Sequence, residues 1–421
     1  MNINNFRAVM LLAGLSLLGL PASAVAKVTG LQDILAATMA RNPAVHGKNA
    51  EIKAKEYATD VARAGRYPSI SLRAGYVNSQ YSNQSSKNNS ISLRARQPLW
   101  AFGRIDSAID YADADLSANR ADLLRINRDL LDKSVVAYAR VLGVYHRQQV
   151  IRDNIASQDK LYQQIKRREE GQLASKADVQ LANLRLIQAR SEQSRSDGDL
   201  LMAINELQAL TQLPIGEVQP VSMKLVDLPA TAAGIEALAL ENSATVHYKA
   251  SLLTLAKANT EREETASMPT IYLQGDKQFN QLAVRNGSQV GIMMDVSLDG
   301  MGFSSYGRSK LAMASEVAAD EGLNVSRNEL IRNVRSLLHN RDMQQQMSGI
   351  LQHSVDEFGH ILSSYMRQYK AGHKAWMEVL NIQREMSSQR LQLVQTKDDW
   401  LLTSLRLMVL TGSFDHTLAA E

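Results

Sequence analysis

The sequence repeats itself after about 200 residues, which limits the chain to folds built from two copies of one unit. Matching landmarks occur in the same order in both halves, with separations that stay between 199 and 201 residues: Asn42 and Asn242, Pro68 and Pro269, Gly103 and Gly302, Gly171 and Gly372, Leu210-Thr211 and Leu410-Thr411. We therefore predict a first structural repeat at 27–213 and a second at 235–412. An equatorial linker at 214–234 joins them, and 413–421 form a C-terminal tail.

Each repeat is predicted to begin with a helical segment, at 31–64 and 235–266, and to continue into two strands. Apolar and polar side chains alternate at every second position in four segments: 70–76, 91–96, 271–276 and 290–297. This alternation is typical of transmembrane β-strands. An amphipathic sheet packed on helices is the alternative, but the polar stretches 78–89 and 281–288 fit solvent loops. We expect four membrane strands per chain.

Long helices are predicted to follow the strands. No proline occurs between Leu99 and Leu213 or after Pro269, so no proline interrupts a helix there. A helix from about Ser107 to Gly171 would extend on the order of 100 Å. It carries two adjacent apolar stripes, one of Leu130, Ala137, Val141, Val144 and Ile151, the other of Leu124, Leu131, Val135, Tyr138, Leu142 and Tyr145. Two stripes indicate that the helix packs on neighbours at both sides, as a stave of a cylinder does.

Each long helix is predicted to end in a glycine reversal. An apolar stripe from Met347 to Tyr369 stops at Gly372, and a helical pattern resumes at Val379. Glycine is typical of a helix C-terminus because it adopts a left-handed conformation cheaply. We expect Gly171 to do the same in the first repeat. The two reversals should then lie together at the end opposite the strands.

Four membrane strands cannot close a barrel, and an open edge in lipid leaves unpaired backbone groups that cost several kcal/mol each. The chain must therefore oligomerise. Two copies would give about 8 strands, a barrel filled by its own side chains, whereas three give about 12 and a lumen. The predicted fold class is mainly α with a small membrane β-barrel. A duplicated β-β-α-α unit builds a trimeric α-helical barrel plus a 12-stranded β-barrel.

Residues 1–26 have the features of a secretory signal peptide, with Arg7, an apolar run and a small-residue cleavage site between Ala24 and Ala26. A membrane anchor is the alternative, but the apolar run is short for a span of roughly 20 residues. The chain has no cysteine, which excludes disulfides and a lipid-anchored cysteine. A formal charge of +4 without a dense basic block disfavours nucleic-acid binding.

No motif indicates catalysis, a cofactor or a metal. The eight histidines, including His353 and His360, form no pair with zinc-ligand spacing. The segment 300–302 lacks the third glycine and the helical context of a nucleotide-binding loop. No nucleophile has a plausible base. We expect a protein that is not an enzyme.

Three segments carry a family resemblance: Gly171-x3-Ser175-x2-Asp178-Val179, the strand-to-helix corner 98–103, and 371–385. With the duplicated unit, they resemble the TolC family of outer-membrane exit ducts, and 371–385 is similar to the type I secretion branch, including ducts that export large adhesins. The resemblance implies a homotrimer in the outer membrane with a long periplasmic extension. It also implies a periplasmic adaptor protein, an inner-membrane ABC transporter and a secreted protein cargo as partners.

The resemblance also implies roles for residues at the reversals. The periplasmic gate would be held by hydrogen bonds among four residues: Tyr369, Lys374, Asp178 and Ser175. The adaptor would touch the tips at five: Gly171, Gln172, Leu173, Gly372 and His373. Glu378 and Asn381 match positions that narrow the pore, and Asn381 replaces the aspartate often found there.

Three arginines, Arg73, Arg94 and Arg96, alternate on the predicted lumen side of the first two strands. They would make the barrel interior basic. The alternative is that they pair with Asp276 and Asp295 of the same wall. Trp100, at the strand-to-helix corner, fits either a membrane-interface residue or simple core packing.

Three functions compete. The first is a trimeric outer-membrane exit duct of a tripartite type I secretion system, which passively conducts an unfolded protein. The second is the outer-membrane duct of a proton-driven small-molecule or metal efflux pump. The third is a periplasmic coiled-coil scaffold without a pore, which leaves the alternating strands unexplained.

Overall fold

The computed structural model describes residues 30–81, 84–220, 231–280, 287–297 and 299–415. The predicted signal peptide, the middle of the linker and the end of the tail lie outside the described residues. Within them, one order of elements occurs twice: α1 (Leu31–Arg41), α2 (Pro43–Ala64), β1 (Ser69–Tyr81), β2 (Gln84–Trp100), α3 (Arg104–Glu170) and α4 (Lys176–Thr211), then α5 (Ala232–Asn242), α6 (Ala244–Thr265), β3 (Thr270–Asn280), β4 (Gly287–Asp295), α7 (Phe303–Lys370) and α8 (Trp376–Thr411), with a short 3-10 turn η2 (Asp299–Gly302) before α7. The duplicated unit is confirmed.

The helical segment that begins each repeat is two helices rather than the single one predicted. Asn42 separates α1 from α2, and its side chain accepts a hydrogen bond from the Ala44 backbone N–H at 3.0 Å. Pro43 follows at the first helical position, where its missing N–H is not needed. Ser243 caps α6 in the same way through the Val246 N–H.

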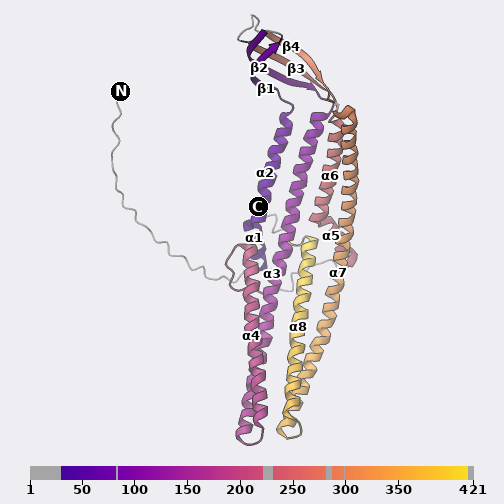
Figure 1. The fold of residues 1–421 in the computed structure, drawn as a ribbon. Helices are drawn as coiled ribbons and strands as arrows, with labels where there is room; N and C mark the ends of the chain where they lie inside the picture. Colours follow the sequence, from indigo (N-terminus) through magenta and orange to yellow (C-terminus); the bar gives the residue numbers. More distant parts are fainter. Residues whose placement is uncertain (1–29, 82–83, 221–230, 281–286, 298, 416–421) are drawn as a thin grey trace, which may run out of the picture.

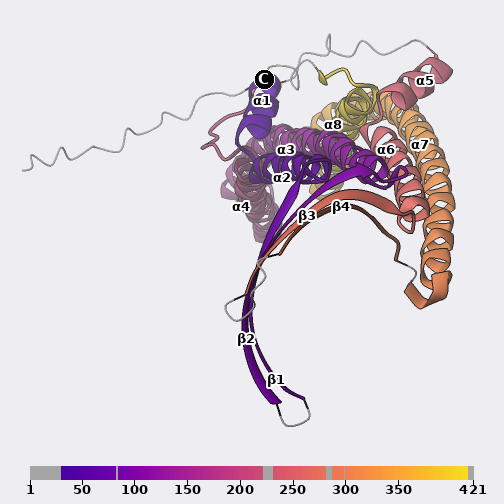
Figure 2. The same ribbon diagram turned by 90° about the horizontal axis from the view of Figure 1, so that it is seen from above.

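The strands form one antiparallel sheet in the order β1-β2-β3-β4, which curves away from the helices (Figure 2). One face is apolar and exposed in the single chain, with Ile70, Leu72, Val290, Ile292 and Met294 each at least 66% accessible. The other face is polar. Strands β1 and β4 are open edges within one chain. This matches the four membrane strands expected per chain.

The predicted loop 78–89 is wrong for most of its length. Strand β1 runs to Tyr81 and β2 starts at Gln84, and the ladder between them continues through pairs such as Asn78 with Lys87. Polar side chains do not stop an antiparallel ladder, because its hydrogen bonds join backbone groups. In the second repeat β3 ends at Asn280 and β4 begins at Gly287, so residues 287–288 of the predicted loop 281–288 belong to a strand, and residues 281–286 lie outside the described residues.

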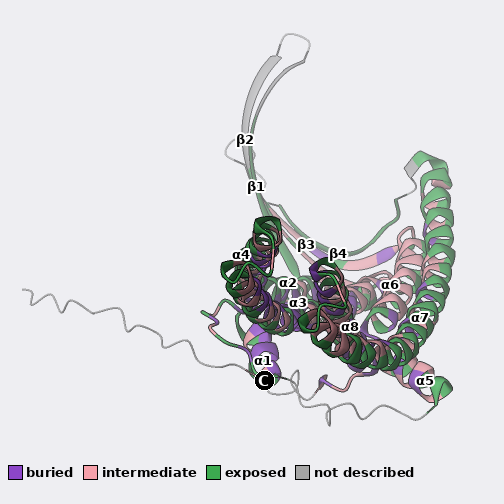
Figure 3. Cartoon of the chain, turned by 90° about the horizontal axis from the view of Figure 1, so that it is seen from below, coloured by how far each residue is buried: buried purple, intermediate pink, exposed green. Residues whose placement is uncertain are grey.

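The shaft consists of the long helices (Figure 1). Helix α3 has 67 residues, about 100 Å at 1.5 Å per residue. Members of both predicted stripes are buried: Leu131, Val135, Tyr138 and Leu142 of one and Leu130, Ala137, Val141 and Ile151 of the other. Figure 3 shows burial concentrated where neighbouring helices meet. Among the described residues, no helix is both long and apolar enough to cross a membrane.

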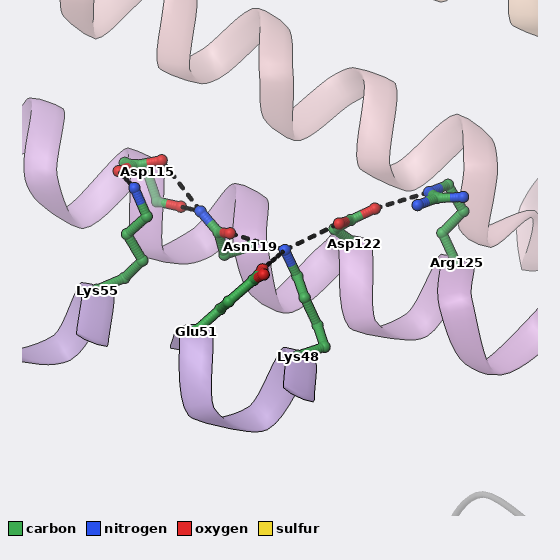
Figure 4. A network of polar contacts seen from close by, with 7 residues as sticks. All are labelled: Lys48, Glu51, Lys55, Asp115, Asn119, Asp122 and Arg125. Carbon is green, nitrogen blue, oxygen red and sulfur yellow. Dashed lines mark hydrogen bonds and ion pairs between the residues drawn. The ribbon is translucent and has the colours of Figure 1, made fainter. Parts of the chain in front are cut away.

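A polar network fixes α2 against α3 (Figure 4). The Lys48 ammonium, on a residue that is 8% exposed, lies 3.0 Å from Glu51 Oε2 and 2.9 Å from both Asn119 Oδ1 and Asp122 Oδ2. Burial alone would lower the pKa of Lys48, but hydrogen bonds with Asp122 and Glu51 outweigh it and the pKa is raised. The buried charge is therefore fully partnered.

The two reversals share one backbone geometry. The two glycines that were predicted to be equivalent, Gly171 and Gly372, do not occupy equivalent positions in it. Gly372 has φ +80°, as expected, whereas Gly171 has φ −85° and Gln172 takes the left-handed position with φ +58°. In both reversals the next N–H returns to the helix, from Leu173 to the Arg168 carbonyl and from His373 to the Gln368 carbonyl. The reversals thus align at an offset of 200, and Gln172 is the counterpart of Gly372.

Candidate functional site at the helix reversals

The two reversals lie at the end of the shaft farthest from the sheet (Figure 1). An apolar cluster joins the α3–α4 hairpin to the α7–α8 hairpin here. Its buried members are Leu161 and Ile165 of α3, Ala182 of α4, and Trp376, Val379 and Leu380 of α8. The two repeats are therefore packed against each other within one chain at this end.

Tyr369 lies between the two hairpins. Its ring is 4.6 Å from Arg168 Cζ of α3 and 5.1 Å, centroid to centroid, from the Trp376 ring of α8. Burial raises the pKa of Tyr369 above its ordinary value, with Arg168 opposing the shift and Asp178 adding to it. No hydrogen bond joins the Tyr369 hydroxyl to Asp178 in the described chain. The predicted gate role of Tyr369 stays a prediction.

Ser175 and Asp178 cap their own helix. The Asp178 backbone N–H donates to Ser175 Oγ at 3.1 Å, and Asp178 Oδ2 accepts from the Ser175 N–H at 3.2 Å and its hydroxyl at 2.7 Å. This reciprocal arrangement satisfies backbone N–H groups at the start of α4. Within one chain, both predicted gate partners are engaged locally.

Lys374 and Glu378 are likewise paired within one hairpin. Lys374 Nζ is 2.8 Å from Glu378 Oε1 and 4.6 Å from the Tyr365 ring centroid. Glu378 Oε2 also accepts from the Ala375 N–H at 3.0 Å, which caps α8. The hydrogen bond from Lys374, helped by that from Ala375, lowers the pKa of the Glu378 carboxyl. Asn381 follows three residues later on the same face of α8 and is exposed.

The residues predicted to meet an adaptor occupy the outermost turns. All five are exposed, and Leu173 is 70% accessible despite its apolar side chain. They belong to two separate loops: Gly171, Gln172 and Leu173 in one, Gly372 and His373 in the other. Their exposure leaves them accessible to another protein, and the adaptor contact stays a prediction.

At the other end of the molecule, the arginines of the polar sheet face form pairs along the wall. Arg94 Nε lies 2.6 Å from Asp276 Oδ1, and Arg96 contacts Gln274 at 2.6 Å and Asp295 at 3.4 Å. Arg73 is exposed on the same face. The alternative to a basic barrel interior, in which Arg94 and Arg96 pair with Asp276 and Asp295 of the same sheet, is thus present.

Sequence reasoning missed Arg168 as a partner of Tyr369. Arg168 stands in the run Lys166-Arg167-Arg168, and periodicity does not tell which of these cations faces the other hairpin. No group of three His, Cys, Asp or Glu side chains in the described ranges has a metal-binding arrangement.

The family model of outer membrane efflux proteins matches residues 34–211 and 237–413, one match in each half of the chain. The chain belongs to this family. Members of the outer membrane efflux protein family are outer-membrane channels with a long helical periplasmic extension, and the channels are homotrimers that work with periplasmic adaptors. Family membership disfavours the scaffold without a pore.

Solved structures share the fold of this efflux protein. CusC is 15% identical with a TM-score of 0.81, covering 92% of this chain and 95% of its own. The outer-membrane channel OprN is 17% identical with a TM-score of 0.80, covering 91% and 89%. VceC of Vibrio cholerae is 15% identical with a TM-score of 0.77, covering 91% and 96%. No curated protein matches the sequence.

Proposed function

We propose that this protein is the outer-membrane exit duct of a tripartite type I secretion system. One observation supports the assignment as a duct: a four-stranded sheet with an exposed apolar face and two open edges lies at the end of a long helical shaft. Three such sheets joined edge to edge give about 12 strands, enough to enclose a lumen.

The duct is passive. An inner-membrane ABC transporter supplies the driving force, and a periplasmic adaptor protein connects it to the exposed turns around Gln172 and Gly372. Leu173, an exposed apolar side chain on such a turn, gives the adaptor a hydrophobic contact.

The periplasmic end is a gate. Tyr369, Lys374, Asp178 and Ser175 are our candidates for closing it, and Glu378 with Asn381 for narrowing the pore. Glu378 and Asn381 lie about one turn apart on α8. Because Asn381 is neutral, each trimer has one carboxylate ring from Glu378 at this level instead of two, which weakens cation binding in the pore.

The cargo we propose is an unfolded secreted protein, such as a large adhesin. This choice rests on the resemblance of residues 371–385 to the type I secretion branch. A second candidate, the duct of a proton-driven small-molecule or metal efflux pump, is favoured by the efflux family model that the chain matches.

Deleting the gene and comparing secreted proteins with drug and metal tolerance separates the two. Loss of one large surface protein with unchanged tolerance supports type I secretion. Lower tolerance with unchanged secreted proteins supports the efflux pump and overturns our choice of cargo. Complementation with the unmodified gene controls for effects on neighbouring genes.

A further inference from the structure

Three side chains from three helices stack at the periplasmic end. Arg168 of α3 lies over the ring of Tyr369 of α7 at 4.6 Å, and that ring lies 5.1 Å from the Trp376 ring of α8 at an interplanar angle of 46°. Trp376 is 4% exposed and belongs to the apolar cluster that includes Leu161 and Ile165. We call Arg168, Tyr369 and Trp376 the tip stack.

The tip stack is held together by contacts to the faces of aromatic rings. A guanidinium over an aromatic face is attracted by the negative face of the ring quadrupole, and tilted aromatic pairs are favourable for the same reason. Arg168 Nε is buried without a hydrogen-bond acceptor among the described residues. The Tyr369 ring lies against the guanidinium that carries this unpaired nitrogen.

At the periplasmic end, some side-chain contacts join the α3–α4 hairpin to the α7–α8 hairpin, and others lie within one hairpin. Arg168 belongs to α3, whereas Tyr369 and Trp376 both belong to the α7–α8 hairpin. If that hairpin swings away, Tyr369 and Trp376 move together and the contact with Arg168 breaks. The Lys374–Glu378 and Ser175–Asp178 contacts each lie within one hairpin and survive the movement.

We propose that the tip stack is a latch that holds the two hairpins of one chain together, and that the ring of Tyr369, not its hydroxyl, is the part that closes it. The proposal rests on the proposed function as a gated duct and revises the gate expected from the sequence, in which Tyr369 acts through a hydrogen bond. Arg168 and Trp376 are positioning residues for the closed state.

Tyr369→Phe and Tyr369→Leu separate ring from hydroxyl. The purified full-length protein is inserted into planar bilayers and its conductance recorded. Tyr369→Phe is expected to remain as closed as the unmodified channel. Tyr369→Leu is expected to raise the ratio of open to closed time about tenfold, since three cation–π contacts per trimer are lost. Equal opening by both variants would show that the hydroxyl closes the gate and would overturn the latch.

Substitutions of Arg168 provide an independent test of the latch. Arg168→Met is expected to open the channel as Tyr369→Leu does, and Arg168→Lys to restore most of the closure because an ammonium also binds a ring face. Arg167→Met is the matched control, because it removes the adjacent, exposed cation and is expected to change nothing. An Arg168→Met channel as closed as the control would overturn the latch.

Assembly is checked for each variant by the trimer's migration in detergent gels. If Tyr369→Leu fails to assemble, the Arg168 variants decide. Absence of conductance from the unmodified protein and from every correctly assembled variant would instead count against the duct itself, and the latch would fall with it.

Discussion

His146 of α3 and Asp398 of α8 form an ion pair, with 2.6 Å between Nδ1 and Oδ1, although 252 residues separate them in the sequence. Gly143, one turn before His146, makes room for this contact, since a Cβ there would lie 3.3 Å from an Asp398 oxygen. The two hairpins are therefore joined along the shaft by an ion pair that depends on the charge of a histidine.

This pair predicts pH-dependent stability. The hydrogen bond with Asp398 raises the pKa of His146 above its ordinary value, against the opposing effect of burial. A raised folded-state pKa stabilises the protein fully below the unfolded value of about 6.5, and this contribution is lost as pH rises through the folded value. His146 is nearly half exposed, so the effect is under about 1 kcal/mol.

We expect the thermal unfolding midpoint of the unmodified protein to exceed that of His146→Gln by more at about pH 5.5 than at about pH 8.5. The measurement is circular dichroism in detergent micelles. Asp398→Asn should abolish the same pH-dependent difference. A difference in unfolding midpoint that does not change with pH would contradict a stabilising His146–Asp398 ion pair.

Lys48 offers a test of the network in Figure 4. Lys48→Met keeps the length of the side chain but removes its charge, and leaves the partly buried Asp122 with Arg125 as its one remaining cationic partner among the described residues. We expect a loss of about 3 kcal/mol in the free energy of unfolding, measured by chemical denaturation. Lys55→Met is the matched control: its pair with Asp115 is more exposed, so its loss should stay below about 1 kcal/mol. Equal losses would show that burial does not matter here.

The duplicated order of strands and long helices could be predicted because period-2 and helical patterns recur at a nearly constant offset. The break at Asn42 was missed, although a capping residue followed by proline does mark a helix start. Two other features could not be predicted. Which residue adopts the left-handed conformation depends on a shift of one position between Gly171 and Gln172. The contact of Arg168 with Tyr369 depends on how two distant hairpins rotate against each other.

The reversals give a prediction about backbone strain. Gly372 has a left-handed φ and open space where a Cβ would stand, so Gly372→Ala should destabilise the turn by about 1 kcal/mol through the backbone alone. Gly171→Ala is the control, because φ there is −85° and its closest contact would be an ordinary 3.6 Å. Hydrogen exchange of the amides at each tip measures the local opening. Faster exchange in Gly171→Ala than in Gly372→Ala would refute the alignment of the two turns.

The same alignment makes Gln172→Gly informative. Gln172 holds the left-handed conformation without being glycine, which costs roughly 1 kcal/mol. Substitution by glycine should relieve this cost and slow exchange at the first tip. The gain will be reduced by the greater freedom of glycine in the open state. Unchanged or faster exchange would mean that the freedom of glycine in the open state, or lost contacts of the Gln172 side chain, outweigh the relief of backbone strain.

The two faces of the sheet should respond oppositely to one charge. Ile292 of β4 is 70% exposed on the apolar face, whereas Gln289 of the same strand pairs with Asp276 on the polar face. An arginine facing lipid costs about 2–4 kcal/mol near the bilayer midplane, and a trimer would carry three. Ile292→Arg should therefore reduce the protein in the outer-membrane fraction severalfold, measured by quantitative blotting after membrane separation. Gln289→Arg gains an acidic neighbour in a hydrated lumen and should insert normally. The reverse outcome would mean that the apolar face of the sheet is not the one in contact with lipid.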